Sequence, residues 1–267
     1  MSVDPFESFK AAQKVGWAHF APLEAHTTAV AAQLVKHAKV HASQRVLDVG
    51  CGTGVAAVTA ARLGAQVTGL DLTPALLQRA RENSRIAGVQ IDWREGDVEN
   101  LPFDGEAFDV VLSQFGHMFA PRPEVATAEM LRVLKPGGTI AFATWPPELF
   151  MGRMFMITAR YAPRPPAGVA PPTEWGDPGI VSQRLGKAVK DILFDRATLL
   201  APALSPQHYR ENIERTAAPV MKVVGALSAS DPEKLAAFRN EYEALIAEYY
   251  EENIVRQDYL LTRALKI

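Results

Sequence analysis

A glycine-rich turn at residues 50–54 reads Gly-Cys-Gly-Thr-Gly and directly follows the apolar run Arg45–Val49. Glycine permits positive φ angles and lets a ligand approach the backbone, because no Cβ stands in the way. A helix that begins after the turn has unpaired N–H groups at its start, which can hold polar ligand atoms. Tight packing turns also use glycine, so the position between a strand and a helix is what favours a ligand site.

Two acidic residues accompany the turn. Asp48 precedes the first glycine, and Asp71 ends the next apolar run, where an acid can accept hydrogen bonds from the hydroxyls of a ribose. The alternative role for Asp71 is to cap the following helix, a position that Thr73 also fills. The glycines alternate as G-x-G-x-G, whereas dinucleotide-binding turns read G-x-G-x-x-G, so the spacing favours a different nucleoside cofactor.

His117 and Cys51 are the side chains of this region that could react. His117 follows a further apolar run, and its imidazole could accept a proton near neutral pH as a catalytic base. The alternative is a histidine that packs the loop or bonds a carbonyl group. Cys51 has no adjacent histidine or acid in the sequence to activate it, so we interpret it as a small residue of the turn.

The elements that position these residues alternate between strand and helix patterns. The expected strands are Arg45–Val49, Gln66–Leu70, Gln90–Arg94, Phe108–Ser113 and Thr139–Thr144, and the expected helices are Val55–Leu63, Pro74–Ala87 and a segment near Glu124–Leu134. This alternation predicts right-handed βαβ crossovers and a parallel sheet with helices on both faces. Ligands of such sheets bind outside the carboxyl ends of the strands, which is where the turn lies.

The remaining sequence predicts elaborations around this core. One or two helices are expected over residues 8–40, and a helix rich in Met and Phe is expected after residue 146. The Pro-rich segment 163–178 is either a plain loop or the edge of a substrate opening. Two further strands, Val189–Leu200 and Gln257–Lys266, and a helical stretch over residues 205–253 complete the chain.

Five motifs in order resemble those of the Rossmann-like, class I S-adenosylmethionine-dependent methyltransferases. They are Asp48–Gly54, Gly69–Asp71, Glu95–Phe103, Phe108–Val111 and Arg132–Gly138. The third is similar to the adenine-binding segment of the ubiquinone-biosynthesis-like, small-molecule branch. The resemblance covers about residues 40–145 and implies an α/β fold: a doubly wound, mostly parallel seven-stranded sheet with an antiparallel last strand, helices on both faces, and helical lid elements.

The resemblance also implies S-adenosylmethionine as cofactor and S-adenosylhomocysteine as product. The glycine turn would face the methionine moiety, Asp71 the ribose hydroxyls and Asp97 the adenine amino group, with Val98 beside the ring. Asp48 would order the turn or balance the positive charge of the cofactor. The full expected cofactor-binding set is Asp48, Gly50, Cys51, Gly52, Gly54, Asp71, Leu72, Asp97, Val98 and Gln114.

The acceptor side is expected around residues 113–119. Methyl transfer from a sulfonium is an in-line displacement, so the protein mainly positions the acceptor and excludes water. The Asn-Pro-Pro-Tyr motif of nucleic-acid amino methyltransferases is missing at Ser113–Gly116, and Gln114 and Thr144 stand near the places where catechol-type enzymes hold magnesium. We therefore expect no metal and an apolar, aromatic or thiol-bearing small molecule. The expected substrate-binding residues are Trp17, Phe20, Phe115, Phe119, Trp145 and Met151.

The net charge and amino-acid composition argue against several kinds of binding partner. The 267 residues carry a net charge of -2 without a basic run, which argues against nucleic acid, and a single Cys excludes an internal disulfide. No signal peptide, long apolar run or basic amphipathic helix is evident, so we expect a cytoplasmic protein without stable membrane contact, as a monomer or homodimer. Residues 1–267 are expected to be a single methyltransferase domain with an N-terminal helical cap (1–40), a core (40–145) and substrate-side elaborations (146–187 and 205–253).

The expected function is S-adenosylmethionine-dependent methylation of a small molecule. The alternative is a catalytically silent S-adenosylmethionine-binding protein that acts as a sensor or in assembly. Hydride transfer with a nicotinamide cofactor is disfavoured by the glycine spacing.

Overall fold

A central β-sheet organises the computed structural model, which describes residues 4–267. The sheet order is β3-β2-β1-β4-β5-β8-β6, and the short β7 pairs with β8. The strands are β1 (Arg45–Val49), β2 (Gln66–Asp71), β3 (Asp92–Glu95), β4 (Phe108–Gln114), β5 (Leu134–Thr144), β6 (Val189–Pro202), β7 (Tyr250–Glu251) and β8 (Ile254–Lys266). Strands β1 to β5 pair in parallel, whereas β8 runs antiparallel to both β5 and β6. The strand order reverses between β1 and β4, and this switch point is where ligands of such sheets bind.

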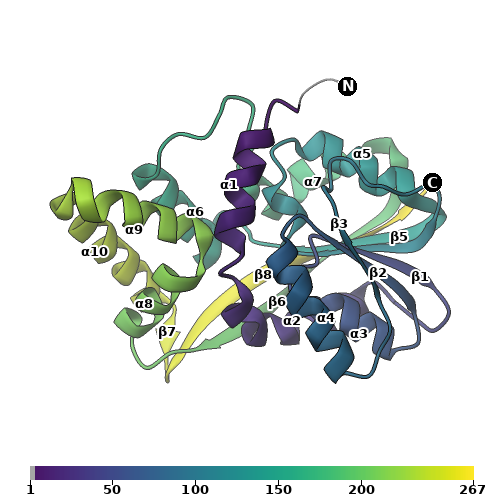
Figure 1. The fold of residues 1–267 in the computed structure, drawn as a ribbon, viewed down its shortest axis with the longest axis horizontal. Helices are drawn as coiled ribbons and strands as arrows, with labels where there is room; N and C mark the ends of the chain where they lie inside the picture. The colour runs from purple at the N-terminus through teal and green to yellow at the C-terminus, as the bar shows by residue number, and fades with distance from the viewer. Residues whose placement is uncertain (1–3) are drawn as a thin grey trace.

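Helices cover both faces of the sheet. They are α1 (Glu7–Trp17), α2 (Glu24–His37), α3 (Val55–Arg62), α4 (Pro74–Ile86), α5 (Pro123–Val133), α6 (Phe150–Tyr161), α7 (Pro178–Leu185), α8 (Pro206–Thr216), α9 (Ala218–Ser230) and α10 (Pro232–Glu248). Helices α2, α3 and α4 lie on one face, and α5 and α7 pack together on the other (Figure 1). The strands β1 and β4 between them are buried apart from one or two positions each, as two covered faces require. The α/β fold expected from the sequence is confirmed.

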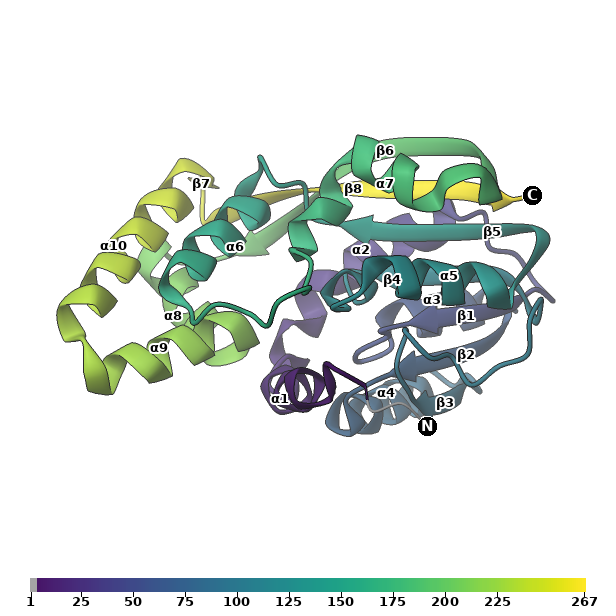
Figure 2. The ribbon, with the colours of Figure 1, turned by 90° about the horizontal axis from the view of Figure 1, so that it is seen from above.

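A group of four helices, α6, α8, α9 and α10, stands at one end of the molecule. Strands β6 and β8 extend from the sheet into this group, and α1 lies between it and the sheet (Figure 2). Helices α8 and α10 begin where sequence signals place them, because Ser205 Oγ accepts the His208 N–H at 3.1 Å and Asp231 Oδ1 accepts the Lys234 N–H at 2.9 Å. The buried side chains of Phe150, Phe238 and Tyr242 give the group its own packed centre.

Several local expectations differ from the structure. The third strand begins at Asp92 and not at Gln90, because it is a polar edge strand without a clear apolar pattern. Strand β5 begins at Leu134, directly where α5 ends, so the segment Lys135–Gly138 lies inside the strand as an irregularity in its pairing with β4. The two-residue β7 adds an eighth strand to the seven expected.

Two further expectations concern where helices begin and end. Thr73 stands at the N-cap of α4, but its side chain makes no capping bond there. The helical stretch expected over residues 205–253 is divided into three helices, two of which begin at the prolines predicted as helix starts, Pro206 and Pro232.

Among the described residues, no helix has both the length and the apolar character needed to cross a bilayer.

Candidate active site

A cavity of about 230 Å³ opens at the carboxyl ends of β1, β2 and β4 and continues beneath α1, α6 and α8. Of the expected cofactor-binding residues, those that line the cavity are Gly50, Cys51, Gly52, Asp71, Leu72, Asp97, Val98 and Gln114. Asp48 and Gly54 do not line it. All the expected substrate-binding residues, namely Trp17, Phe20, Phe115, Phe119, Trp145 and Met151, line the same cavity. The two predicted sets therefore meet in one continuous space.

The glycine turn has the backbone geometry that only glycine adopts without strain. Gly50, Gly52 and Gly54 have φ angles of 62°, 54° and 81°. A Cβ on Gly50 would lie 2.8 Å from the Gly116 Cα, and one on Gly54 would lie 2.5 Å from the Trp93 ring, so these two glycines allow close packing. At Gly52 a Cβ would meet nothing within 4 Å. Gly52 is therefore the position where the turn presents open backbone to the cavity.

Asp71 connects the turn to the start of α4. Its side chain is buried, with Oδ2 accepting the Gly52 N–H and Oδ1 accepting the Thr73 N–H, both at 2.8 Å. Burial raises the pKa of Asp71, and the two N–H donors act against this shift. Because each carboxylate oxygen has two lone pairs, the side chain keeps acceptor capacity toward the cavity. Asp71 therefore binds the residue that precedes α4 without capping the helix, and it lines the cavity where a ribose was expected.

Asp48 lies behind the turn. Its side chain is buried, with Oδ2 accepting the Ala57 N–H at 3.0 Å near the start of α3 and Oδ1 without a partner among the described residues. Burial raises the pKa of Asp48 to about 8, and the nearby Asp71 charge acts in the same direction. This placement favours the role of ordering the turn over direct contact with the cofactor.

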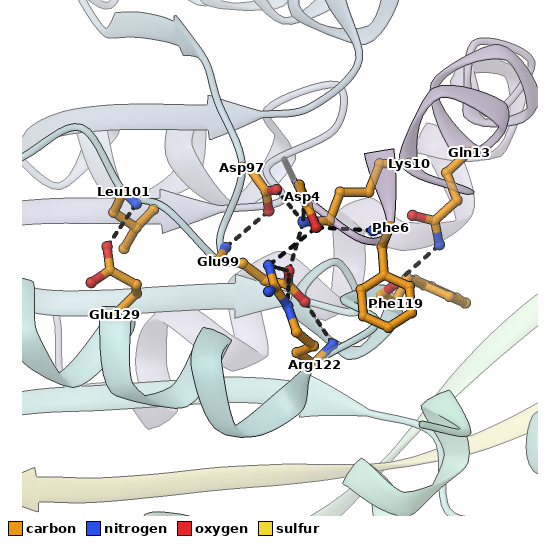
Figure 3. A network of polar contacts seen from close by, with 10 residues as sticks. All are labelled: Asp4, Phe6, Lys10, Gln13, Asp97, Glu99, Leu101, Phe119, Arg122 and Glu129. Atoms are coloured by element: carbon orange, nitrogen blue, oxygen red, sulfur yellow. Dashed lines mark hydrogen bonds and ion pairs between the residues drawn. The ribbon is translucent and has the colours of Figure 1, made fainter. Parts of the chain in front are cut away.

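An ion-pair network joins α1 to the segment after β3 (Figure 3). Lys10 Nζ lies 2.6 Å from carboxylate oxygens of Asp4, Asp97 and Glu99, and Arg122 binds Glu99 at 2.7 Å. Burial disfavours the ammonium, but its bonds to the three carboxylates outweigh this and raise the pKa of Lys10. These acidic side chains could otherwise hold a cation, and the ammonium already lies among them.

The network fixes the side chain expected to bind adenine. Asp97 Oδ2 accepts from Lys10, and Oδ1 accepts the Glu99 N–H at 2.9 Å. Lys10, Glu99 and Arg122 were not predicted from the sequence as contributors to the site. No local pattern pairs Lys10 with acids that lie 87 and 89 residues further along the chain.

His117 is enclosed by aromatic rings. Its imidazole is 1% exposed and lies with its centroid 4.6 Å from that of Phe142 and 4.4 Å from that of Trp175. Neither ring nitrogen has a hydrogen-bond partner among the described residues. Burial, together with the charge of Arg184, lowers the pKa of His117 to about 3. Such a ring is a poor proton acceptor, so the geometry favours the packing role over that of a catalytic base.

Trp175 belongs to the Pro-rich segment 163–178. The sequence allowed two roles for this segment, a plain loop or the edge of a substrate opening. Residues 163–178 do not line the cavity. Instead this segment buries Trp175 against His117 and brings its carbonyl oxygen 2.8 Å from the Thr144 hydroxyl, which donates to it. The segment therefore closes the outer side of the loop after β4.

Replacing His117 by phenylalanine is expected to change how stability depends on pH. In the folded chain the imidazole stays neutral down to about pH 3, whereas it protonates near 6.5 when the chain unfolds. Between these values the unfolded state binds the additional proton, so stability falls by about 1.4 kcal/mol per pH unit as the pH decreases. Urea unfolding at pH 7, 6 and 5 should show a steeper loss for the parent protein than for His117→Phe.

His41→Phe is the matched control for this experiment, because His41 is exposed. Parallel pH dependences for the parent and His117→Phe would show that His117 is protonated in the folded chain and would contradict its enclosure.

Aromatic side chains form the walls of the cavity beyond the glycine turn. Phe115 stacks on Trp145 with centroids 3.9 Å apart, and its φ of 59° places it in a conformation uncommon outside glycine. Trp17 packs against Phe119 at 4.6 Å and against Phe20 at 6.0 Å. These contacts bring α1 and the loop after β4 together over the predicted transfer site.

Gln114 adds the polar group of this wall. Its Nε2 donates to the Thr27 carbonyl at 2.8 Å, and its buried Oε1 has no partner among the described residues. The side chain lines the cavity, so Oε1 can accept a hydrogen bond from a bound molecule. This is consistent with a ligand contact at Gln114, the residue that ends β4.

Comparison with known proteins decides the family. Residues 47–142, which contain the glycine turn, Asp71 and Asp97, match the family model described as a methyltransferase domain. The chain belongs to the class I S-adenosylmethionine-dependent methyltransferases. An uncharacterized protein of Mycobacterium tuberculosis is 36% identical to this methyltransferase over 87% of the chain and 85% of the relative. The ubiquinone biosynthesis O-methyltransferase of Xanthomonas axonopodis pv. citri is 42% identical over 39% of the chain and 44% of the relative.

The fold of this methyltransferase agrees with that assignment. The crystal structure of the YcgJ protein from Bacillus superposes with a TM-score of 0.60 at 19% identity, over 88% of this chain and 97% of that one. S-adenosylmethionine is the cofactor of this family. The phosphoethanolamine N-methyltransferase 2 of Haemonchus contortus, whose fold is similar at 18% identity with a TM-score of 0.54, was crystallised with it. The open backbone at Gly52 and the acceptor capacity of Asp71 fit the polar groups of this cofactor, and the aromatic walls fit its apolar surface.

Proposed function

We propose that this methyltransferase transfers the methyl group to a small, apolar or aromatic molecule. The observation that carries the proposal is the continuity of the cavity, which runs from the glycine turn directly into the aromatic compartment around Trp17, Phe115 and Trp145. Pockets of this kind, mostly apolar with a few polar groups, suit small organic ligands. When bound, the cofactor supplies an electrophilic methyl group.

The residues of the chain contribute position and exclusion of water. The stacked pair of Phe115 and Trp145 and the contact of Trp17 with Phe119 cover the space beside the glycine turn. Gln114 Oε1 is the group that could orient a hydroxyl, amine or thiol of the acceptor by accepting its hydrogen bond. Alignment of a bound acceptor with the methyl group is the main requirement of such a displacement.

The test uses two substitutions on one helix. Met151 lines the cavity, so Met151→Trp should fill the acceptor compartment and lower turnover at least about tenfold, with cofactor affinity within about twofold of the parent. Met156 lies on the same helix, α6, and is 50% exposed, so Met156→Trp is the matched control. Release of S-adenosylhomocysteine is measured over a panel of phenols, quinols, thiols and apolar amines, and binding is measured by calorimetry.

The outcomes separate the proposal from the silent-binding alternative. Turnover that Met151→Trp removes and Met156→Trp leaves intact supports the proposal. Tight cofactor binding by the parent without turnover of any class in the panel would favour a sensor or assembly protein instead. Turnover that is insensitive to Met151→Trp would place the acceptor elsewhere.

A further inference from the structure

The far end of the cavity lies outside the part of the chain shared with the methyltransferase domain model. This end is formed by the extension of β6 and β8 and by the helices that they carry. Its lining includes Leu199, Tyr209, Ile213, Val220, Tyr242 and Gln257. The polar groups among them belong to Tyr209, Tyr242 and Gln257, and those of Tyr209 and Gln257 are hydrogen-bonded to each other.

Tyr209 and Gln257 form a buried polar pair that is only partly satisfied. Tyr209 is 3% exposed and Gln257 is 5% exposed, and Gln257 Nε2 lies 2.9 Å from the Tyr209 hydroxyl oxygen. With the amide donating, the tyrosine proton and Gln257 Oε1 remain free. With the amide turned over, Gln257 Nε2 and a lone pair of the hydroxyl remain free. In either arrangement the pair keeps at least one donor and one acceptor.

The pair is held at a defined place by the sheet. Gln257 pairs with Leu199 in the register of β8 and β6, and both side chains line the cavity. Tyr209 lies in the first turn of α8, next to the cap made by Ser205, and its ring packs against Phe150 with centroids 5.8 Å apart. Two rigid elements therefore fix the donor and the acceptor.

Among the residues that the structure describes, no charged side chain lines this end of the cavity. Burial raises the pKa values of Tyr209 and Tyr242, so both hydroxyls stay neutral at physiological pH. The charged neighbour Arg210 is paired with Glu214 at 2.5 Å and with Glu243 at 2.6 Å, and these three residues do not line the cavity. An ionised group placed here would lose its hydration without gaining an opposite charge, which is costly.

We propose that Tyr209 and Gln257 form a subsite for an uncharged group that both donates and accepts hydrogen bonds, namely a hydroxyl or a carboxamide. The group belongs to an otherwise apolar molecule whose opposite end lies beside the glycine turn. The inference rests on the proposed function, because the same molecule is taken to be the methyl acceptor. It deepens that proposal by stating which end group the protein recognises and by excluding carboxylates and ammonium ions from that end.

The experiment compares probes that share a 4-butylphenyl group and differ only in the group opposite the butyl chain. They are 4-butylbenzamide, 4-butylbenzyl alcohol, 4-butylbenzoate, 4-butylbenzylammonium and, as the apolar reference, 4-butyltoluene. Each displaces the neutral fluorophore N-phenyl-1-naphthylamine from the full chain saturated with S-adenosylhomocysteine. The amide and the alcohol are expected to displace it at concentrations about tenfold lower than the two ions, in line with the net free energy of buried hydrogen bonds.

Variants assign this preference to the pair. Tyr209→Phe and Gln257→Met should each reduce the affinity for the amide and the alcohol about five- to tenfold and leave 4-butyltoluene unchanged. Tyr250→Phe is the matched control, because the Tyr250 hydroxyl is bonded to the Leu204 carbonyl outside the cavity. Thermal unfolding of each variant is measured alongside, and Gln257→Met nearly keeps the side-chain volume if Tyr209→Phe folds poorly.

Equal or better displacement by the benzoate or the ammonium probe would overturn the subsite, and so would variants that keep the preference of the parent. Failure of the proposed function looks different. In that case the parent protein does not bind S-adenosylhomocysteine in calorimetry, or it binds S-adenosylhomocysteine but shows no turnover. The probe displacement is then repeated without S-adenosylhomocysteine, and the order of probe affinities still tests the subsite.

Discussion

Replacing Asp71 by alanine is expected to weaken the binding of S-adenosylhomocysteine by about 100-fold or more. The substitution removes the acceptor of the Gly52 and Thr73 N–H groups, each held at 2.8 Å. A buried donor left without a partner costs about 1–3 kcal/mol, and a tenfold change in affinity corresponds to about 1.4 kcal/mol. The substitution therefore destabilises the glycine turn itself, and it also removes the contact expected with the ribose. Calorimetric titration measures the effect directly.

Two further variants make the result specific to Asp71. Asp71→Asn keeps one acceptor oxygen and should bind with intermediate affinity. Asp92→Ala removes an exposed acid of the neighbouring β3, whose partner is Arg94, and should change affinity by less than about twofold. Binding by Asp71→Ala within about threefold of the parent, at an unchanged Tm, would show that the carboxylate neither orders the turn nor contacts the cofactor.

Replacing Lys10 by methionine is expected to release α1 from the cofactor side of the molecule. The side chain of Lys10 is 8% exposed and that of Glu99 is 1% exposed, so the substitution leaves converging carboxylates without the ammonium that neutralises them. Removing one partner of a buried ion pair costs about 3–5 kcal/mol. Because Lys10 is the buried residue of α1 and its other side chains are partly or fully exposed, we expect local opening of this helix before global unfolding. Hydrogen exchange of residues 7–17 should accelerate, and S-adenosylhomocysteine should bind about tenfold more weakly.

A control for this prediction lies one turn along the same helix. Lys14 pairs with Glu95 at 2.7 Å, but these side chains are 37% and 51% exposed, and exposed pairs contribute about 0–1 kcal/mol. Lys14→Met should therefore leave exchange and affinity nearly unchanged. The double substitution Lys10→Met with Asp4→Asn should recover part of the loss, because Arg122 still pairs with Glu99 at 2.7 Å but approaches Asp4 only to 3.4 Å. Equal effects of Lys10→Met and Lys14→Met would contradict the role given to the buried network.

The central part of the fold could be predicted because its signals are local. The apolar runs that became β1, β2 and β4, the glycines of the turn, and the proline that opens α4 each act within a few residues. Where local patterns are weak, prediction was poorer. The polar edge strand β3 and the start of β5 at Leu134 were placed wrongly by two to five residues, since pairing with a neighbouring strand decides those boundaries.

The side chains of the site depend on contacts that the sequence does not display. His117 was expected beside the transferring methyl group, and its backbone does lie next to the glycine turn, but Trp175 and Phe142 enclose the ring. Lys10 carried no signal, because two of its three acidic partners, Asp97 and Glu99, lie in a distant segment. The pairing of Tyr209 with Gln257 likewise depends on how β8 carries Gln257 toward α8, a tertiary arrangement that periodicity cannot reveal.

The long antiparallel pair of β6 and β8 sets the depth of the acceptor compartment. Side chains of a strand alternate between its two faces, and each residue advances about 3.4 Å. A relative of this protein with one residue more in each strand would turn the residue at the position of Gln257 away from the cavity. Two residues more in each strand would restore its direction and move it about 7 Å farther from the glycine turn. Strand length in this pair therefore offers a stepwise way for related proteins to accept molecules of different lengths.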